Sequence, residues 1–329
     1  FDASGRATRE LNDQSVLGLD YVHDANGQLA GVGGDQSAQY PYDAAGNRTD
    51  GSGGQVYQIG PGNQLANGQG FRFRYDAAGN LRRKIDDGAD VRLDLQYDHR
   101  NRLVGAQRYD STRALDGSAN YRHDGLGRRI AQTVDPDGDG EAPSVTAWMI
   151  SDGDQVYADL DAAGGSPIRY LHGEAVDQLL ARTDATGDTS WYLTDRLGSV
   201  RKVANAAGEV TGSLDYDPFG QPRTRTGDVD RFGFTGREYE PATGLQHNRN
   251  REYDPALGRW TSRDPIGLAG GDANLYRYVG NEPTRLVDPF GLRPPAAKAP
   301  GAPAPTPPPA PTRPPSMTPI GVDDGGPAE

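Results

Sequence analysis

Apolar and polar residues alternate along most of the chain. Residues 71–75 and 91–97 carry an apolar side chain at every second position. This period of two is typical of β-strands that bury one face and expose the other. Similar strands are expected at 147–150, 167–171 and 190–193. Helical periodicity is scarce, and residues 174–183 are its best, still weak, example.

A short motif recurs between these strands: an aromatic residue, an aspartate, two variable residues and a glycine. Clear copies start at Phe1, Tyr42 and Tyr75. Looser copies lie at 21–27, 97–103, 121–128 and 217–220. Aspartate bonds to the backbone ahead of it and glycine accepts a positive φ, so the motif predicts a hairpin tip. The repeated units predict an all-β fold, a ribbon of antiparallel hairpins.

Composition adds one further region to this ribbon. The chain holds 45 glycines and 25 prolines, and its 16 tyrosines exceed its 7 phenylalanines, which suits half-exposed sheets. Thirteen of the prolines follow Leu292. Residues 293–329 are therefore expected to form an extended, disordered Pro/Ala-rich tail or linker. A polyproline ligand for a partner groove is an alternative for this tail.

Charge and missing residue types exclude several classes of protein. A net charge of −12 argues against a nucleic-acid partner. There is no cysteine, and no apolar run approaches the length of a membrane-spanning helix. The five histidines show no ligand spacing, so neither a metal nor a cofactor is predicted. The chain opens on Phe1 without a start methionine or signal peptide, and we expect it to belong to something longer.

Residues 135–141 are rich in aspartate and glycine, as calcium loops are. The EF-hand pattern requires a carboxylate at its twelfth position, where this chain has Thr146. A solvated hairpin tip is the better interpretation.

One five-residue phrase occurs twice near the end of the patterned region. It spans Asp264 to Leu268 (DPIGL) and Asp288 to Leu292 (DPFGL). Asp-Pro-x-Gly favours a turn, and two such turns would be able to place two carboxyls close together. From spacing alone, aspartates that only cap turns remain the simpler interpretation.

Taken together, these motifs resemble the RHS (rearrangement hot spot) family. The tyrosine–aspartate units are similar to its YD repeats, and residues 234–292 resemble its RHS-repeat-associated core domain. The resemblance implies a spiralling β-ribbon that forms a cocoon, with the core domain plugging one end. It also implies the division 1–146 (YD repeats), 147–235 (strands leading into the core), 236–292 (core domain) and 293–329 (tail).

The same resemblance implies a function. Such shells enclose a C-terminal effector in bacterial polymorphic toxins and toxin complexes, and are reported to cut their own chain after DPxGL as aspartyl proteases. Carried onto this chain, the cleaved bond is Leu292–Arg293 and the acids are Asp264 and Asp288, with Arg263 assisting. Asp272 is an alternative acid. The alternative function is a non-catalytic structural or adhesive YD-repeat shell.

Partners and location follow from this resemblance too. They are a C-terminal effector domain, absent from this chain, upstream RHS repeats, and components of a secretion machine or toxin complex. The protein would be made in the bacterial cytoplasm and secreted or delivered to a target cell.

Overall fold

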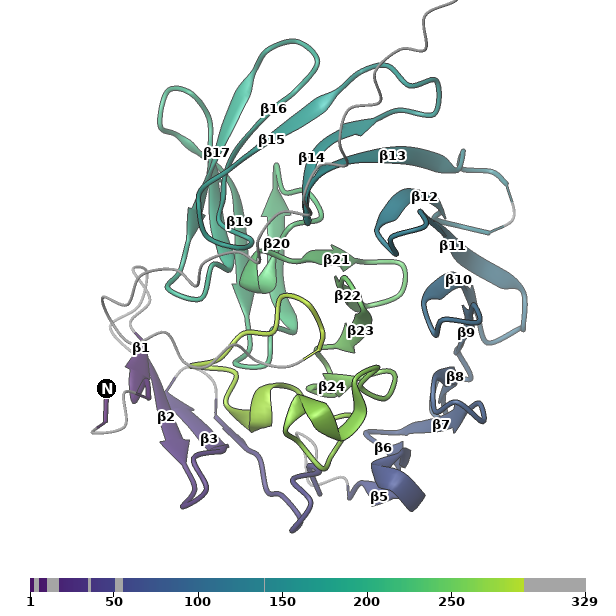
Figure 1. Cartoon of the computed structure of the whole chain (residues 1–329), viewed down its shortest axis with the longest axis vertical. Coiled ribbons are helices and arrows are strands. Elements are labelled where there is room, and N and C mark those ends of the chain that lie inside the picture. Colours follow the sequence, from purple (N-terminus) through teal and green to yellow (C-terminus); the bar gives the residue numbers. More distant parts are fainter. Residues whose placement is uncertain (3–5, 11–17, 35–36, 51–55, 139, 293–329) are drawn as a thin grey trace, which may run out of the picture. The chain divides into compact units, whose positions relative to one another are not determined.

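Almost all of the secondary structure consists of antiparallel strands (Figure 1). The computed structural model describes residues 1–2, 6–10, 18–34, 37–50, 56–138 and 140–292, and the predicted tail at 293–329 lies outside them. Within this part of the chain the strands form one sheet of sixteen and two of four. The predicted all-β ribbon is therefore confirmed. The weak helix prediction at 174–183 is wrong, because Leu179–Thr183 pair as a strand with both neighbours.

The sixteen-stranded sheet is a meander in which each strand pairs with the next one along the chain. Its strands are β5 (Gln58–Ile59), β6 (Leu65–Gly68), β7 (Phe71–Tyr75), β8 (Leu81–Asp86), β9 (Arg92–Tyr97), β10 (Leu103–Tyr109), β11 (Leu115–His123), β12 (Arg129–Asp135), β13 (Val145–Asp152), β14 (Gln155–Leu160), β15 (Ile168–His172), β16 (Leu179–Thr183), β17 (Thr189–Thr194), β18 (Val200–Ala204), β19 (Val210–Tyr216) and β20 (Pro222–Gly227). The aspartate- and glycine-rich stretch that resembles a calcium loop leads from β12 to β13. These two strands pair with each other, as the strands on either side of a hairpin tip do.

Two smaller sheets and four 3-10 turns complete the described elements. The first sheet comprises β1 (Arg9–Glu10), β2 (Leu19–His23), β3 (Leu29–Gly34) and β4 (Ala38–Gln39). The second comprises β21 (Glu238–Glu240), β22 (Leu245–Asn248), β23 (Arg251–Asp254) and β24 (Arg259–Trp260). The 3-10 turns are η1 (Pro61–Asn63), η2 (Phe234–Gly236), η3 (Gly267–Gly270) and η4 (Val279–Asn281). We call β1–β20 the shell and β21–β24 the core strands.

The hairpin tips have the chemistry that the repeated motif predicts. At the tip after β7, Asp76 accepts hydrogen bonds from the backbone amide of Asn80 (2.8 Å) and from its side-chain amide (2.9 Å). Gly79 lies between them at a φ of 90°, which residues with a β-carbon rarely adopt. The pair Asp43 and Asn47 repeats both bonds at 2.9 Å. Both of these tips are thus closed by their own aspartate.

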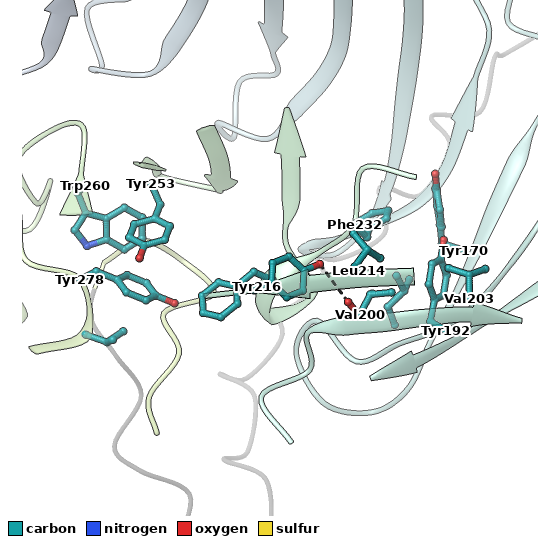
Figure 2. Close-up of a cluster of buried hydrophobic side chains, with 13 residues drawn as sticks. Tyr170, Tyr192, Val200, Val203, Leu214, Tyr216, Phe232, Tyr253, Trp260 and Tyr278 are labelled. Carbon is teal, nitrogen blue, oxygen red and sulfur yellow. Dashed lines mark hydrogen bonds between the residues drawn. The ribbon is translucent and has the colours of Figure 1, made fainter. Parts of the chain in front are cut away.

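The core strands are buried by shell residues from more than one direction. In Figure 2, the rings of Tyr253, Trp260 and Tyr278, which contact one another edge to face or tilted, belong to the same apolar cluster as Tyr170 and Tyr192 of the shell. A second cluster joins core residues to other shell strands; it includes Leu65, Phe73, Leu95, Leu245 and Leu257. The shell therefore supplies much of the hydrophobic surroundings of the core strands.

The segment between the two Asp-Pro turns is attached to hairpin tips near the start of the chain. Its Asn274 and Asn281 side chains donate hydrogen bonds to the carbonyls of Ala45 (3.0 Å) and Gly46 (2.8 Å). The Tyr276 hydroxyl donates to the Gly79 carbonyl at 2.7 Å. Contacts across about two hundred positions thus fix this segment. The domain boundaries at 146 and 235 stay predictions.

We predict that shortening a shell side chain beneath the core strands destabilises the whole unit. Leu95 in β9 is fully buried in the cluster that contains Leu245. Leu95→Ala is expected to lower the free energy of unfolding by about 2–5 kcal/mol, measured by chemical denaturation with tryptophan fluorescence. Leu126, which is 82% exposed at a tip, provides the control: Leu126→Ala is expected to change it by less than about 0.5 kcal/mol. Equal effects of the two substitutions would contradict the prediction.

Candidate functional site

The structure brings Asp264 and Asp288 together on one guanidinium. Nη2 of Arg251, in β23, lies 3.0 Å from Asp264 Oδ2 and 3.4 Å from Asp288 Oδ2. Arg251 and Asp288 are buried and Asp264 is partly buried, with side-chain exposures of 3%, 1% and 9%. Two acids that lie 24 positions apart therefore share one cation away from bulk water.

Each aspartate also organises its own turn, which explains why the same phrase occurs twice. Asp264 Oδ1 accepts the Ile266 amide at 3.0 Å, and the Asp264 carbonyl accepts the Gly267 amide at 2.9 Å. Asp288 Oδ1 accepts the Leu292 amide at 3.2 Å. In both turns one carboxylate oxygen is used locally and the other faces Arg251. Each aspartate thus stabilises its own turn and binds Arg251 at the same time.

The surroundings of the pair change its acid–base behaviour. Burial raises the pKa of the Asp264 carboxyl above its usual range, and Arg251 opposes this shift. Burial raises the pKa of Asp288 in the same way, again against the pull of Arg251. Burial lowers the pKa of Arg251 itself to about 10. The site therefore favours one retained proton on two neighbouring carboxyls.

Arg251 was missed by sequence reasoning, which chose Arg263. Arg263 is exposed, lies beside Gly79, and within the described residues makes no hydrogen bond or ion pair with either acid. Arg251 instead stacks on the Trp260 ring, 4.1 Å from its centroid. The alternative acid, Asp272, pairs with Arg277 at 2.7 Å. No local sequence pattern marks Arg251; it stands in the short strand Arg251–Asp254, all of whose residues are buried in the structure.

The Leu292 carbonyl lies beside the Asp264 carboxyl. A β-carbon placed on Gly270 would be 3.0 Å from Asp264 Oδ2 and 3.1 Å from the Leu292 carbonyl oxygen. Both oxygens thus lie next to Gly270, where a β-carbon would make tight contacts with each of them. Arg293, on the other side of the predicted cleavage bond, lies outside the described residues.

Residues 248–251 hold the backbone leading to Leu292 in a fixed register. Each of these four side chains donates a hydrogen bond to the carbonyl found 40 positions later. The bonds run from Asn248 Nδ2 to Asp288 O (2.8 Å), Arg249 Nη1 to Pro289 O (2.6 Å), Asn250 Nδ2 to Phe290 O (2.9 Å) and Arg251 Nε to Gly291 O. We call residues 248–251 the register tract. The carbonyls of residues 288–291 accept these four bonds, whereas the carbonyl of Leu292 accepts none from the tract.

No group of three or more His, Asp or Glu residues in the described part of the chain is arranged to hold a metal ion. None of the described helices is long and apolar enough to cross a membrane.

We predict that Arg251 is required for stability in a pH-dependent way. In Arg251→Gln the two buried carboxyls lose their cation, and their folded-state pKa rises further above that of the unfolded chain. Stability is then lost as pH rises through that pKa. At neutral pH the free energy of unfolding should fall by about 3–5 kcal/mol, with a smaller deficit near pH 5. Chemical denaturation across this pH range measures it.

The control is the other candidate arginine. Because Arg263 is exposed and unpaired with either acid, Arg263→Gln should change the free energy of unfolding by less than about 0.5 kcal/mol at any of these pH values. Equal losses in both variants, or a deficit that grows toward low pH, would refute the cation role of Arg251.

Comparison with known proteins places these features in a family. The teneurin YD-shell family matches residues 1–284. The chain is 30% identical to the toxin protein Tse5 of Pseudomonas aeruginosa, over 86% of this chain and 26% of that protein. It is also 30% identical to the double-stranded DNA deaminase toxin A of Burkholderia cenocepacia, over 77% of this chain and 19% of that protein. The chain thus spans about a quarter or less of these relatives.

A solved structure shows the same fold. The crystal structure of TcdB2-TccC3-Cdc42 matches 84% of this chain and 17% of its own, with a TM-score of 0.52 and 17% identity. The family match covers most of the chain and agrees with the ribbon of Asp-closed hairpins around the core strands. The chain therefore belongs to the teneurin YD-shell family and is an RHS/YD-repeat shell protein.

Proposed function

We propose that this shell encloses a C-terminal effector and releases it from the chain by cutting the Leu292–Arg293 bond once, as an aspartyl protease. The observation that carries the proposal is the Leu292 carbonyl oxygen beside Asp264, whose carboxyl shares Arg251 with Asp288. Turn-capping aspartates alone would not need a shared buried cation or a scissile carbonyl next to them.

In the proposed mechanism the two acids divide the work. Asp264 is protonated and donates a hydrogen bond to the Leu292 carbonyl oxygen, which makes the carbonyl carbon more electrophilic. Asp288 is ionised and takes a proton from the attacking water as its oxygen bonds to that carbon. Collapse of the tetrahedral intermediate breaks the C–N bond, and the Arg293 nitrogen leaves with the proton that Asp288 took from the water. The raised pKa of both carboxyls makes protonation of one of them easier than for an exposed aspartate, as this mechanism requires.

Arg251 has a positioning and electrostatic role in this mechanism. Its Nη2 fixes both carboxyls, and its Nε holds the Gly291 carbonyl, the neighbour of the reacting one. A fixed positive charge near the developing oxyanion stabilises it without reorganisation. The proposal therefore assigns to Arg251 the part that sequence reasoning gave to Arg263.

The names of the relatives support the biological part of the proposal. Tse5 and the deaminase toxin A are toxins, and each is several times longer than the matched region. We infer that this chain is the shell part of a bacterial toxin that is secreted or delivered to a target cell. Its partners would be an effector domain, further YD repeats, and a secretion machine or toxin complex.

We predict that the purified wild-type chain has a mass ending at Leu292. Asp264→Asn and Asp288→Asn should each retain the full-length mass, because neither variant leaves both a proton donor and a base in the pair. Intact-mass spectrometry of the three chains measures this. A full-length wild-type chain would leave the non-catalytic shell as the function, and cleavage in either variant would remove that acid from the mechanism.

Gly270 provides a test that leaves both acids in place. Gly270→Ala puts a methyl group 3.0 Å from Asp264 Oδ2 and 3.1 Å from the Leu292 carbonyl oxygen, so it separates the acid from its target. Cleavage should slow by about tenfold or more, because the methyl group forces the two oxygens to move by a few tenths of an ångström and the rate depends steeply on their placement. The control is Gly88→Ala, because Gly88 does not have a positive φ and lies far from the two acids. The neighbouring Gly271 would not serve, since its positive φ would make an alanine there strained. Unchanged cleavage in Gly270→Ala would contradict the placement of Asp264.

A further inference from the structure

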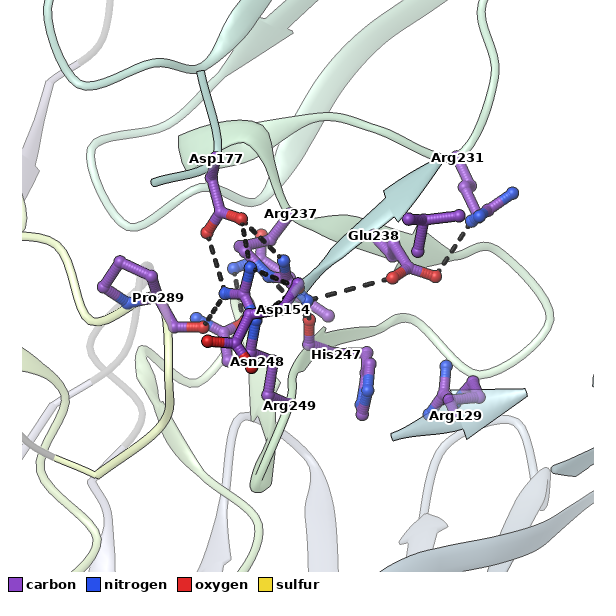
Figure 3. A network of polar contacts seen from close by, with 12 residues as sticks. Arg129, Asp154, Asp177, Arg231, Arg237, Glu238, His247, Asn248, Arg249 and Pro289 are labelled. Carbon is purple, nitrogen blue, oxygen red and sulfur yellow. Dashed lines mark hydrogen bonds and ion pairs between the residues drawn. The ribbon is translucent and has the colours of Figure 1, made fainter. Parts of the chain in front are cut away.

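Arg249 connects the shell to the turn that precedes the cleavage bond. It lies in the connection between β22 and β23 and is a member of the register tract, where its Nη1 donates to the Pro289 carbonyl at 2.6 Å. Its guanidinium also lies over the Phe290 ring, 4.8 Å from the centroid. Figure 3 shows Arg249 between Pro289 on one side and Asp177 on the other. Unlike the other members of the tract, Arg249 also binds the shell.

Two shell connections supply its remaining partners. Asp177, between β15 and β16, accepts from Nη2 at 2.6 Å and from Nη1 at 3.1 Å. The Asp154 carbonyl, between β13 and β14, accepts from Nε at 3.0 Å and from Nη2 at 2.8 Å. Since a guanidinium is planar and rigid, acceptors on two edges fix the direction of the third. The shell thus aims Nη1 at Pro289.

Arg249 and Asp177 adopt an unfavourable backbone conformation, which indicates that the surrounding contacts hold them in place. Arg249 and Asp177 both have a positive φ, 58° and 56°, which residues with a β-carbon rarely adopt. Both side chains are nearly buried, with exposures of 13% and 6%. Asp177 is shared with Arg237, whose Nη1 lies 2.9 Å away, so two core arginines converge on one shell carboxylate. A buried guanidinium without these acceptors would carry an uncompensated charge.

We propose that Arg249 is a positioning residue that makes cleavage at Leu292 depend on docking of the β13–β14 and β15–β16 connections. This inference rests on the proposed function. When the two connections are away from the core, the guanidinium turns to solvent and the Pro289 carbonyl loses its donor. The turn at 288–292 then leaves its register, and the Leu292 carbonyl moves from Asp264. The chain is cut only when this part of the shell has closed over it.

The experiment follows cleavage of the full chain from the moment of synthesis. Chains made by cell-free translation are sampled over time, and the fraction ending at Leu292 is measured by mass spectrometry. Arg249→Gln and Asp177→Asn are expected to slow cleavage by about tenfold or more, because each removes a charge-assisted contact that fixes the turn. Arg249→Lys retains one charged donor and should fall between Arg249→Gln and wild type.

Asp159→Asn is the matched control. Asp159 is also a nearly buried shell carboxylate paired with an arginine, Arg231, but neither residue contacts the turn at 288–292. Its cleavage rate should stay within about twofold of wild type. Urea denaturation of each variant, made in the Asp264→Asn background so that every chain stays intact, gives the loss of stability for comparison.

The outcomes separate this inference from the proposed function. A slower Asp177→Asn chain that is no less stable than Asp159→Asn, with partial recovery in Arg249→Lys, supports positioning. Rates that follow stability alone, or wild-type cleavage in Arg249→Gln, overturn this inference and leave the protease in place. A wild-type chain that stays uncut overturns the proposed function and this inference with it.

Discussion

The structure depends on one constraint: charged side chains in β23 are buried, and buried charges must be paired. Glu252 and Asp254 in β23 are buried beside the tyrosines and tryptophan of the core. Their cations come from the shell, Arg129 for Glu252 and Lys84 for Asp254, each at 2.9 Å. Removing a charge from water costs several kcal/mol unless its partner is in place. The core strands therefore have a stable form only inside the ribbon.

The same constraint produces the chemistry of the candidate site. Burial raises the pKa of Asp264 and Asp288 and lowers that of Arg251, so the two carboxyls hold protons at a higher pH than exposed aspartates do. At His247, burial favours loss of a proton instead. Its Nδ1 lies 2.8 Å from Glu252, yet burial holds its pKa well below the usual range, so it remains neutral. At these residues burial outweighs the nearby charges, whereas at Glu238 the surrounding arginines outweigh burial and lower the pKa of the carboxyl.

Local features of the structure could be predicted from the sequence. A period of two at 71–75 became strand β7 because side-chain alternation depends only on neighbouring residues. The tip at Asp76 followed from the same few positions. The helix predicted at residues 174–183 was wrong, because strand pairing with β15 and β17 outweighed a weak helical pattern.

The site was predictable only in part, and the reason is physical. Asp264 and Asp288 stand in a repeated phrase, so resemblance pointed to them. Arg263 was chosen because it is adjacent to Asp264, but its side chain is exposed, whereas Asp264 turns to Arg251. Arg251 reaches the pair because β23 runs beside the turn at 288–292. That pairing spans about forty positions and leaves no local signal in either segment.

Distance along the chain also sets the order of assembly. Contacts between residues far apart in sequence form after local hairpins, because closing a long loop costs entropy before any contact compensates for it. The segment between the two acids docks on tips some two hundred positions earlier, through Tyr276 to Gly79 and Asn281 to Gly46. The register tract binds a turn 40 positions later and is itself held by Asp177. Each half of the site thus waits for a different part of the shell, so the pair is complete only after both parts have folded around it.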